Sequence, residues 1–150
     1  MNYVKTCVYI LVIAMILSLV LTYASILTII QTTKSNTERV LDSFVIENST
    51  YIFDSIKNGN DFTSGIDLWY FIYRFYLDST LDFDGIYFYN KDENGRNIYK
   101  ITSPQTTFTV DNTLNLTCTF DLLIPVDFAG KQVTTIRIPI KVNSSYNLKN

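Results

Sequence analysis

A long uncharged stretch near the N-terminus constrains the fold of this chain more than any other feature. Residues 7–30, CVYILVIAMILSLVLTYASILTII, form 24 consecutive positions without a charge. About 20 apolar residues suffice for a helix to cross the hydrocarbon core of a bilayer, which is roughly 30 Å thick. The stretch therefore predicts a transmembrane helix, and residues 31–150 are left to form one small soluble domain.

A cleaved secretory signal is the competing interpretation of this stretch. Lys5 would supply its basic head, and TYA before Ser25 would be a tolerable cleavage site. However, the apolar block is longer than the core of a signal peptide and continues past that site to Ile30. We therefore expect an uncleaved anchor.

The orientation of the predicted span depends on a nearly balanced charge distribution. Lys5 lies on one side, and Lys34 and Arg39 lie on the other. Because a head of six residues is a poor candidate for translocation, residues 1–6 are expected in the cytoplasm and residues 31–150 outside. The prediction is a single-pass protein of the cell membrane in contact with lipid.

Small side chains recur on one face of the predicted span. Ala14, Ser18 and Thr22 follow one another every four residues, and Ser25 falls on the same face. Such a stripe lets a second helix approach closely, which favours self-association or packing against other membrane subunits. The alternative is that the hydroxyl groups bond to carbonyls of their own helix. Both interpretations remain open at this point.

The helix is predicted to continue well beyond the membrane. The first glycine is Gly59 and the first proline is Pro104, so residues 1–58 contain neither of the usual helix breakers. After residue 39, apolar side chains gather on one side of a helical wheel. They are Val40, Leu41, Phe44, Val45, Tyr51, Ile52 and Ile56, with Asn48 among them. A helix over residues 4–57 would be about 80 Å long, and residues 31–37 are its weakest part because Thr and Asn lower helix propensity.

A second helix, ending near Ser79, is unusually aromatic. Residues 69–76, WYFIYRFY, contain six aromatic side chains. Trp69, Ile72, Phe75 and Tyr76 share one face of this helix, while Tyr70, Phe71 and Tyr73 spread over the remainder. We favour a core helix that covers a sheet and the first helix. The alternative is an interfacial membrane helix or a docking surface, and for a docking surface Trp69, Tyr70 and Tyr73 are the candidate protein contacts.

The periodicity changes from 3.6 to 2 after residue 85, which predicts strands. GIYFYN and NIYKIT flank KDENGR, whose Asn94-Gly95 pair indicates a hairpin, and residues 107–110 add a short strand. Alternating runs on either side of DFAGKQ predict a long antiparallel hairpin. Its register places Ile124 opposite Ile136, Leu122 opposite Ile138 and Phe120 opposite Ile140. Pro125 and Pro139 cannot donate to a ladder, so each is expected at an edge or a bulge of a sheet of about four strands.

The chemistry needed for most catalytic and cofactor sites is missing from the sequence. The chain has no histidine, and its five glycines form no phosphate-binding loop. Its two cysteines provide no metal pair, and Cys118 is expected to be a small buried residue. The net charge is -2 without a Lys/Arg cluster, which argues against nucleic acid as a partner. No catalytic, metal or cofactor residues are assigned, and we expect a protein that is not an enzyme.

The predicted α+β architecture resembles that of type IV pilins and pseudopilins. In both, a long N-terminal helix is membrane-embedded in its first half, amphipathic in its second, and followed by a small antiparallel sheet. The ending LLIPVDFAGKQVTTIRIPIKVNSSYNLKN is similar to that of TadE-type minor pseudopilins. The resemblance implies a structural or assembly subunit of a pilus or secretion system, with other such subunits as partners. MNYVKTCVYILV lacks the Gly or Ala and the Glu of a prepilin peptidase site.

A second hypothesis for function comes from a different class of protein. FDGIYFYNKDENGRNIYKI looks like the two-strand unit of extracytoplasmic sensing folds, whose cleft binds a small molecule. In this interpretation the domain would act with a signalling partner in the membrane.

Overall fold

The computed structural model describes residues 2–61, 68–110, 113–128 and 131–147. The chain divides into two units, Met1–Thr33 and Lys34–Asn150. Helix α1, Asn2–Lys57, runs through residues 31–37 without a break. The continuous helix expected over residues 4–57 is therefore confirmed.

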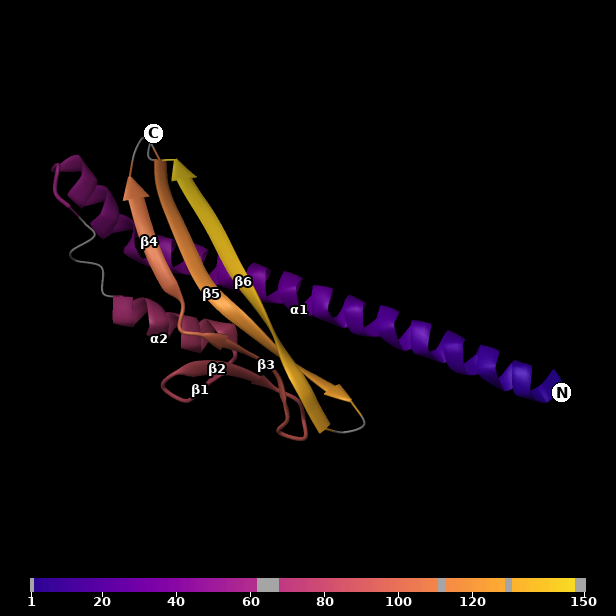
Figure 1. The fold of residues 1–150 in the computed structure, drawn as a ribbon. Coiled ribbons are helices and arrows are strands. Elements are labelled where there is room, and N and C mark those ends of the chain that lie inside the picture. Colours follow the sequence, from indigo (N-terminus) through magenta and orange to yellow (C-terminus); the bar gives the residue numbers. More distant parts are fainter. Residues whose placement is uncertain (1, 62–67, 111–112, 129–130, 148–150) are drawn as a thin grey trace. The chain divides into compact units, whose positions relative to one another are not determined.

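Helix α2, Leu68–Ser79, completes the helical part of the described residues. It ends at Ser79, because the φ of 58° at Thr80 does not continue a helix. The strands are β1 (Asp82–Phe83), β2 (Tyr87–Lys91), β3 (Asn97–Thr102), β4 (Gln105–Val110), β5 (Thr113–Phe128) and β6 (Lys131–Asn147). They form one curled antiparallel sheet, which makes the Lys34–Asn150 unit an α+β fold (Figure 1).

Strand β5 organises the sheet. The order is β1-β2-β3-β5-β4, and β6 pairs with β5 on its other side. β3 and β4 both pair with the same edge of β5, β4 along its first half and β3 only at Leu122 and Leu123. The sheet thus has six strands rather than about four. The two residues of β1 are too few to show a period of two, which is why the sequence did not indicate this strand.

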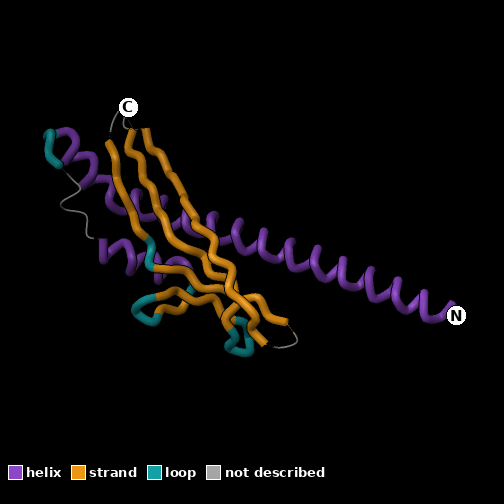
Figure 2. The backbone as a smooth tube through the Cα atoms, viewed as in Figure 1, coloured by secondary structure: helices purple, strands orange, loops and turns teal. Residues whose placement is uncertain are grey.

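The two longest strands, β5 and β6, run side by side as a hairpin (Figure 2). This hairpin has the expected register. The aligned pairs are Ile124 with Ile136, Leu122 with Ile138 and Phe120 with Ile140. Since a shift of one residue would turn every side chain to the other face, the alternating pattern leaves little freedom in register. Among the described strands β6 pairs only with β5, so Pro139 lies in an edge strand as predicted, and Pro125 lies next to the register shift at Val126/Asp127.

A row of aromatic rings joins the two helices to the inner face of the sheet. Phe44 of α1 meets Phe71 of α2 edge to face, with ring centroids 5.3 Å apart, and it stacks near Phe108 of β4 at 6.2 Å. Phe75 of α2 meets Phe88 of β2 at 5.1 Å. Phe44, Phe71, Phe75 and Phe88 are all at most 1% exposed. The core helix expected at residues 69–76 is therefore present.

The faces of both helices differ in detail from the sequence prediction. On α1, Val40, Leu41, Phe44, Val45 and Ile52 are buried as expected, but Tyr51 is 45% exposed. Thr37 and Ser55 take part in the buried face instead, because small polar side chains fit between the helix and the residues packed on it. On α2, Phe71 and Phe75 are buried, whereas Tyr76 is 43% exposed. Its buried face is therefore rotated away from the one the sequence suggested.

Candidate functional site

The first candidate site is the N-terminal part of α1. This helix is long and apolar enough to cross a membrane, and it is compatible with a single-pass anchor. Its large apolar side chains are exposed within the described structure, for example Ile13, Leu17 and Leu21 at 64%, 58% and 62%. Such a continuous exposed apolar surface is far larger than soluble proteins carry, and it calls for lipid or protein around it.

The small-residue stripe is accessible on this helix. Ala14, Ser18, Thr22 and Ser25 are all exposed. The hydroxyl of Thr22 donates to the carbonyl oxygen of Ser18 at 2.9 Å, and that of Thr28 donates to the carbonyl of Ala24 at 3.0 Å. The local bond considered as an alternative is thus formed by Thr22. A hydroxyl that bonds to a carbonyl of its own helix adds no bulk to this face. The local hydrogen bond and the close approach of a second helix are therefore compatible.

The second candidate site is the outward face of α2. Tyr73 is 56% exposed and Tyr70 is 40% exposed. Trp69 lies within α2, but its side chain is outside the described residues. Tyr70 packs against α1, since its hydroxyl donates to Glu47 Oε2 at 3.2 Å and its ring centroid lies 6.2 Å from that of Phe44. Of the two tyrosines, Tyr73 is the one whose ring is more open to a partner.

Charged side chains connect the C-terminal part of α1 to α2 and β6. Arg74 of α2 forms a salt bridge with Glu47. On the other side, Asp42 accepts hydrogen bonds from the hydroxyls of Tyr146 and Ser144 on β6, the latter at 3.1 Å. Burial and the bond to Asp42 raise the pKa of Tyr146 to about 12. These contacts fix the helix against α2 and β6, and they account for charges that the sequence pattern left unassigned.

Asp84 forms a compact turn before β2. Its carboxylate accepts the backbone N–H groups of Tyr87 at 2.7 Å and Ile86 at 2.8 Å, and the hydroxyl of Tyr89 at 2.6 Å. The bonds from Tyr87, Tyr89 and Ile86 lower the pKa of Asp84 from 3.8 to about 2. All three donors stabilise the charged form, so the arrangement is one of turn formation rather than acid catalysis.

The turn at Asp84 predicts a defined loss of stability in acid. Because the folded pKa is depressed, its contribution is complete above the unfolded pKa near 4 and is lost as the pH falls towards 2. Asp84→Asn keeps an acceptor oxygen but does not titrate, so its stability should vary less over this pH window than that of the wild type. Thermal unfolding of both proteins between pH 2 and 6 measures the difference. Parallel pH profiles would contradict the assignment.

A surface cavity of about 290 Å³ lies beside the hairpin β2–β3. β3 pairs with β5 only at Lys100 and Ile101, and the cavity is found where this pairing stops. Its lining includes Arg96, Asn97 and Lys100 from the β2–β3 side and Leu123, Asp127 and Thr135 from β5–β6. This is where a small polar ligand would fit in the sensing hypothesis, which stays a prediction. The sequence could not place the cavity because it depends on where two strands separate.

The two cysteines differ in their surroundings. Cys7 is exposed on α1, and Cys118 is fully buried on β5; neither forms a disulfide. Burial raises the pKa of the Cys118 thiol to about 12, so it stays protonated at neutral pH, as expected for a packing residue. Within the part of the chain that the structure describes, no three His, Cys, Asp or Glu side chains gather into a group that could hold a metal ion.

Comparison with known proteins adds no relative. The chain matches no protein-family model, and searches of curated proteins and of solved structures give no match either.

Proposed function

We propose that this protein is a membrane-anchored, non-catalytic subunit of pilin-like architecture, in which the N-terminal helix both holds the chain in the membrane and packs against helices of other subunits. The domain formed by residues 31–150 would lie outside the cell and residues 1–6 in the cytoplasm. Its partners would be further copies or other membrane subunits of a pilus or secretion assembly.

One observation carries the proposal: a single helix serves two different environments. Residues 3–25 of α1 expose apolar side chains all round, whereas residues 40–52 bury one face against the domain. A signal sequence would need only the first property, and a core helix only the second. Helix α1 has both in one element without glycine or proline, which is the arrangement that pilin-like subunits share.

The paired charged side chains of the domain agree with a structural role. Within the domain, Arg74 forms a salt bridge with Glu47, and Arg137 forms one with Asp121. The hydroxyl of Tyr146 donates a hydrogen bond to Asp42. These contacts link α1 to α2 and β6, and β6 to β5. A structural function requires no more than such a rigid head on an anchored helix.

The stripe on α1 gives the test of this proposal. Ser18→Leu combined with Thr22→Leu fills the shallow face with bulky side chains, so recovery of a second, differently tagged copy from detergent-solubilised membranes should fall about tenfold or more, as expected if a few favourable helix–helix contacts are lost. Ile16→Leu with Val20→Leu, on the opposite face of the helix, is the matched control and should leave recovery unchanged.

Two outcomes would contradict the assignment of the stripe. Unchanged recovery for the Ser18 and Thr22 variant would show that copies do not meet at this face. Equal losses for this variant and for the control would show that the apolar helix associates without a preferred face.

A further inference from the structure

Strand β6 forms one edge of the described sheet and is its longest strand, with 17 residues. Lys131–Asn147 pairs with β5 along its length except at Val133, where the register shifts, and no other described strand lies on its outer side. An open edge of this length presents unpaired backbone N–H and C=O groups and can join the edge of a second copy. Whether β6 joins a second copy depends on the residues whose backbone groups point away from β5.

The hydrogen bonds of β5 show which residues of β6 face outward. Asp121 donates its backbone N–H to Thr102 Oγ1 at 3.0 Å, on the side of β5 away from β6. In an antiparallel pair, two opposite residues either hydrogen-bond to each other or both direct their backbone groups away from the pair. Pro139 lies opposite Asp121, so the backbone groups of Pro139 point away from β5. By alternation Arg137 and Lys141 also direct their backbone groups to the open edge. All three are exposed.

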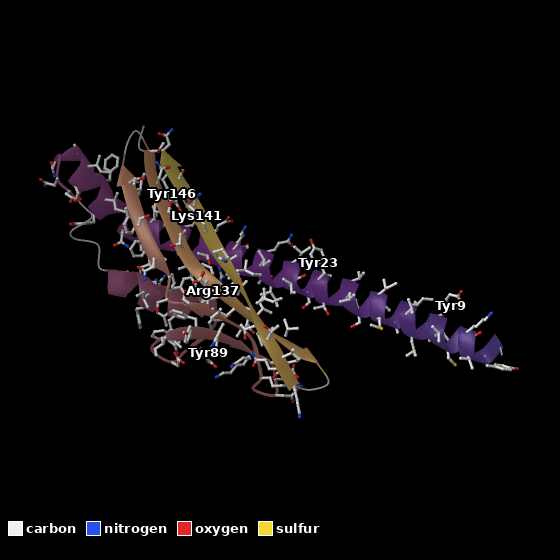
Figure 3. The ribbon with its side chains drawn as sticks, viewed as in Figure 1. Tyr9, Tyr23, Tyr89, Arg137, Lys141 and Tyr146 are labelled. Carbon is white, nitrogen blue, oxygen red and sulfur yellow. The ribbon has the colours of Figure 1, made fainter. Side chains whose placement is uncertain are left out.

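These three residues oppose pairing with a second copy. Pro139 has no N–H to donate at a position where an incoming strand needs one. In an antiparallel pair of two β6 strands centred on Pro139, Arg137 of each copy would lie opposite Lys141 of the other. Centring on Lys141 would place the two Lys141 side chains opposite each other. Like charges in directly opposite positions destabilise a strand pair. Arg137 is ion-paired with Asp121 of its own copy, so the repulsion between two Lys141 side chains is the stronger of the two. Figure 3 shows Arg137 and Lys141 along β6.

We propose that Arg137, Pro139 and Lys141 form a stop that keeps the β6 edges of neighbouring copies from joining, so that contact between copies is left to other surfaces. Two other strands, β4 and β1, also form edges of the described sheet, and β1 has only two residues. β4, Gln105–Val110, has six residues without a charge or a proline, but it is short, which itself limits edge pairing. The proposal is independent of the proposed function, because it concerns only the backbone of β6 and its side chains.

The experiment compares edge contacts in full-length protein in detergent. All variants carry Cys7→Ser, which removes the exposed thiol, and Asn143→Cys, which places a thiol at an outward position of β6. A bifunctional maleimide then reports contact between two edges. Pro139→Thr with Lys141→Thr is expected to give about tenfold more cross-linked dimer than the parent, which corresponds to about 1.4 kcal/mol. Pro125→Thr with Lys100→Thr makes the same exchanges on β5 and β3 and should match the parent.

Two results would overturn the proposal. Abundant dimer in the parent protein would show that the edge is open despite Pro139 and Lys141. No gain in dimer for the double variant over the control would show that these residues do not close it. Cys118 reports folding, since the buried thiol should stay unreactive. If the double variant is unfolded by this criterion, Lys141→Thr alone decides, because its exposed side chain takes no part in the core and its loss should raise the dimer in the same direction.

Discussion

Phe75→Ala is expected to destabilise the Lys34–Asn150 unit by about 3–5 kcal/mol. The ring is 1% exposed and contacts another aromatic ring of its own helix and one from each of two strands. Its centroid lies 6.3 Å from Phe71, 5.1 Å from Phe88 and 6.4 Å from Phe120. Removing it leaves a cavity that its neighbours, held by the backbone of three elements, cannot close. The free energy of unfolding of a native protein is about 5–15 kcal/mol, so a loss of this size is a large share of it.

Denaturant unfolding of the full chain in detergent measures this effect, with Tyr76→Ala as the control. Tyr76 is the next residue on α2 and is 43% exposed, so its truncation should cost less than about 1 kcal/mol. If Phe75→Ala cost no more than Tyr76→Ala, α2 would not be part of the core.

Two arginines in the middle of the apolar stretch should abolish membrane anchoring. Leu17→Arg with Leu21→Arg replaces two exposed apolar side chains of α1 near the centre of the predicted span. On the insertion scale each arginine costs about 2.5–3.5 kcal/mol and each lost leucine removes a favourable contribution, so the pair opposes insertion by about 6 kcal/mol or more. The fraction of protein that stays in membranes after alkaline extraction should fall sharply.

The control for this prediction is Leu17→Ala with Leu21→Ala, which shortens the same side chains without adding charge. It should remain in the membrane fraction. If the arginine variant also resisted alkaline extraction, the helix would not be held by a bilayer, and the anchor would have to be sought elsewhere.

Features with a strong period could be predicted from sequence, because backbone geometry leaves few alternatives. The register of Ile124 with Ile136 follows from an alternation that a slip of one residue would invert. The continuity of α1 through residues 31–37 follows from the absence of glycine and proline, even though threonine and asparagine have low helix propensity. In both cases a local rule acts over many residues and outweighs individual exceptions.

Features that depend on contacts between elements could not be predicted in the same way. Helix α2 carries aromatic side chains on every face, so hydrophobicity alone did not identify Phe71 as inward and Tyr76 as outward. The partners of Asp42 and Glu47 lie 104 and 27 residues away, at Tyr146 and Arg74. The candidate site shows both cases, since the stripe on α1 follows from spacing, whereas the support of Tyr70 by Glu47 is visible only in the structure.

A cysteine scan tests our proposal that copies of this protein meet through one face of a helix held in the membrane. Single cysteines would replace residues 11–27 one at a time in a Cys7→Ser chain, and oxidation in native membranes would join neighbouring helices. We expect disulfide-linked dimers to peak at positions 14, 18, 22 and 25 and to be weak at 16, 20 and 27. Dimers at no position, or equal amounts at all positions, would contradict it.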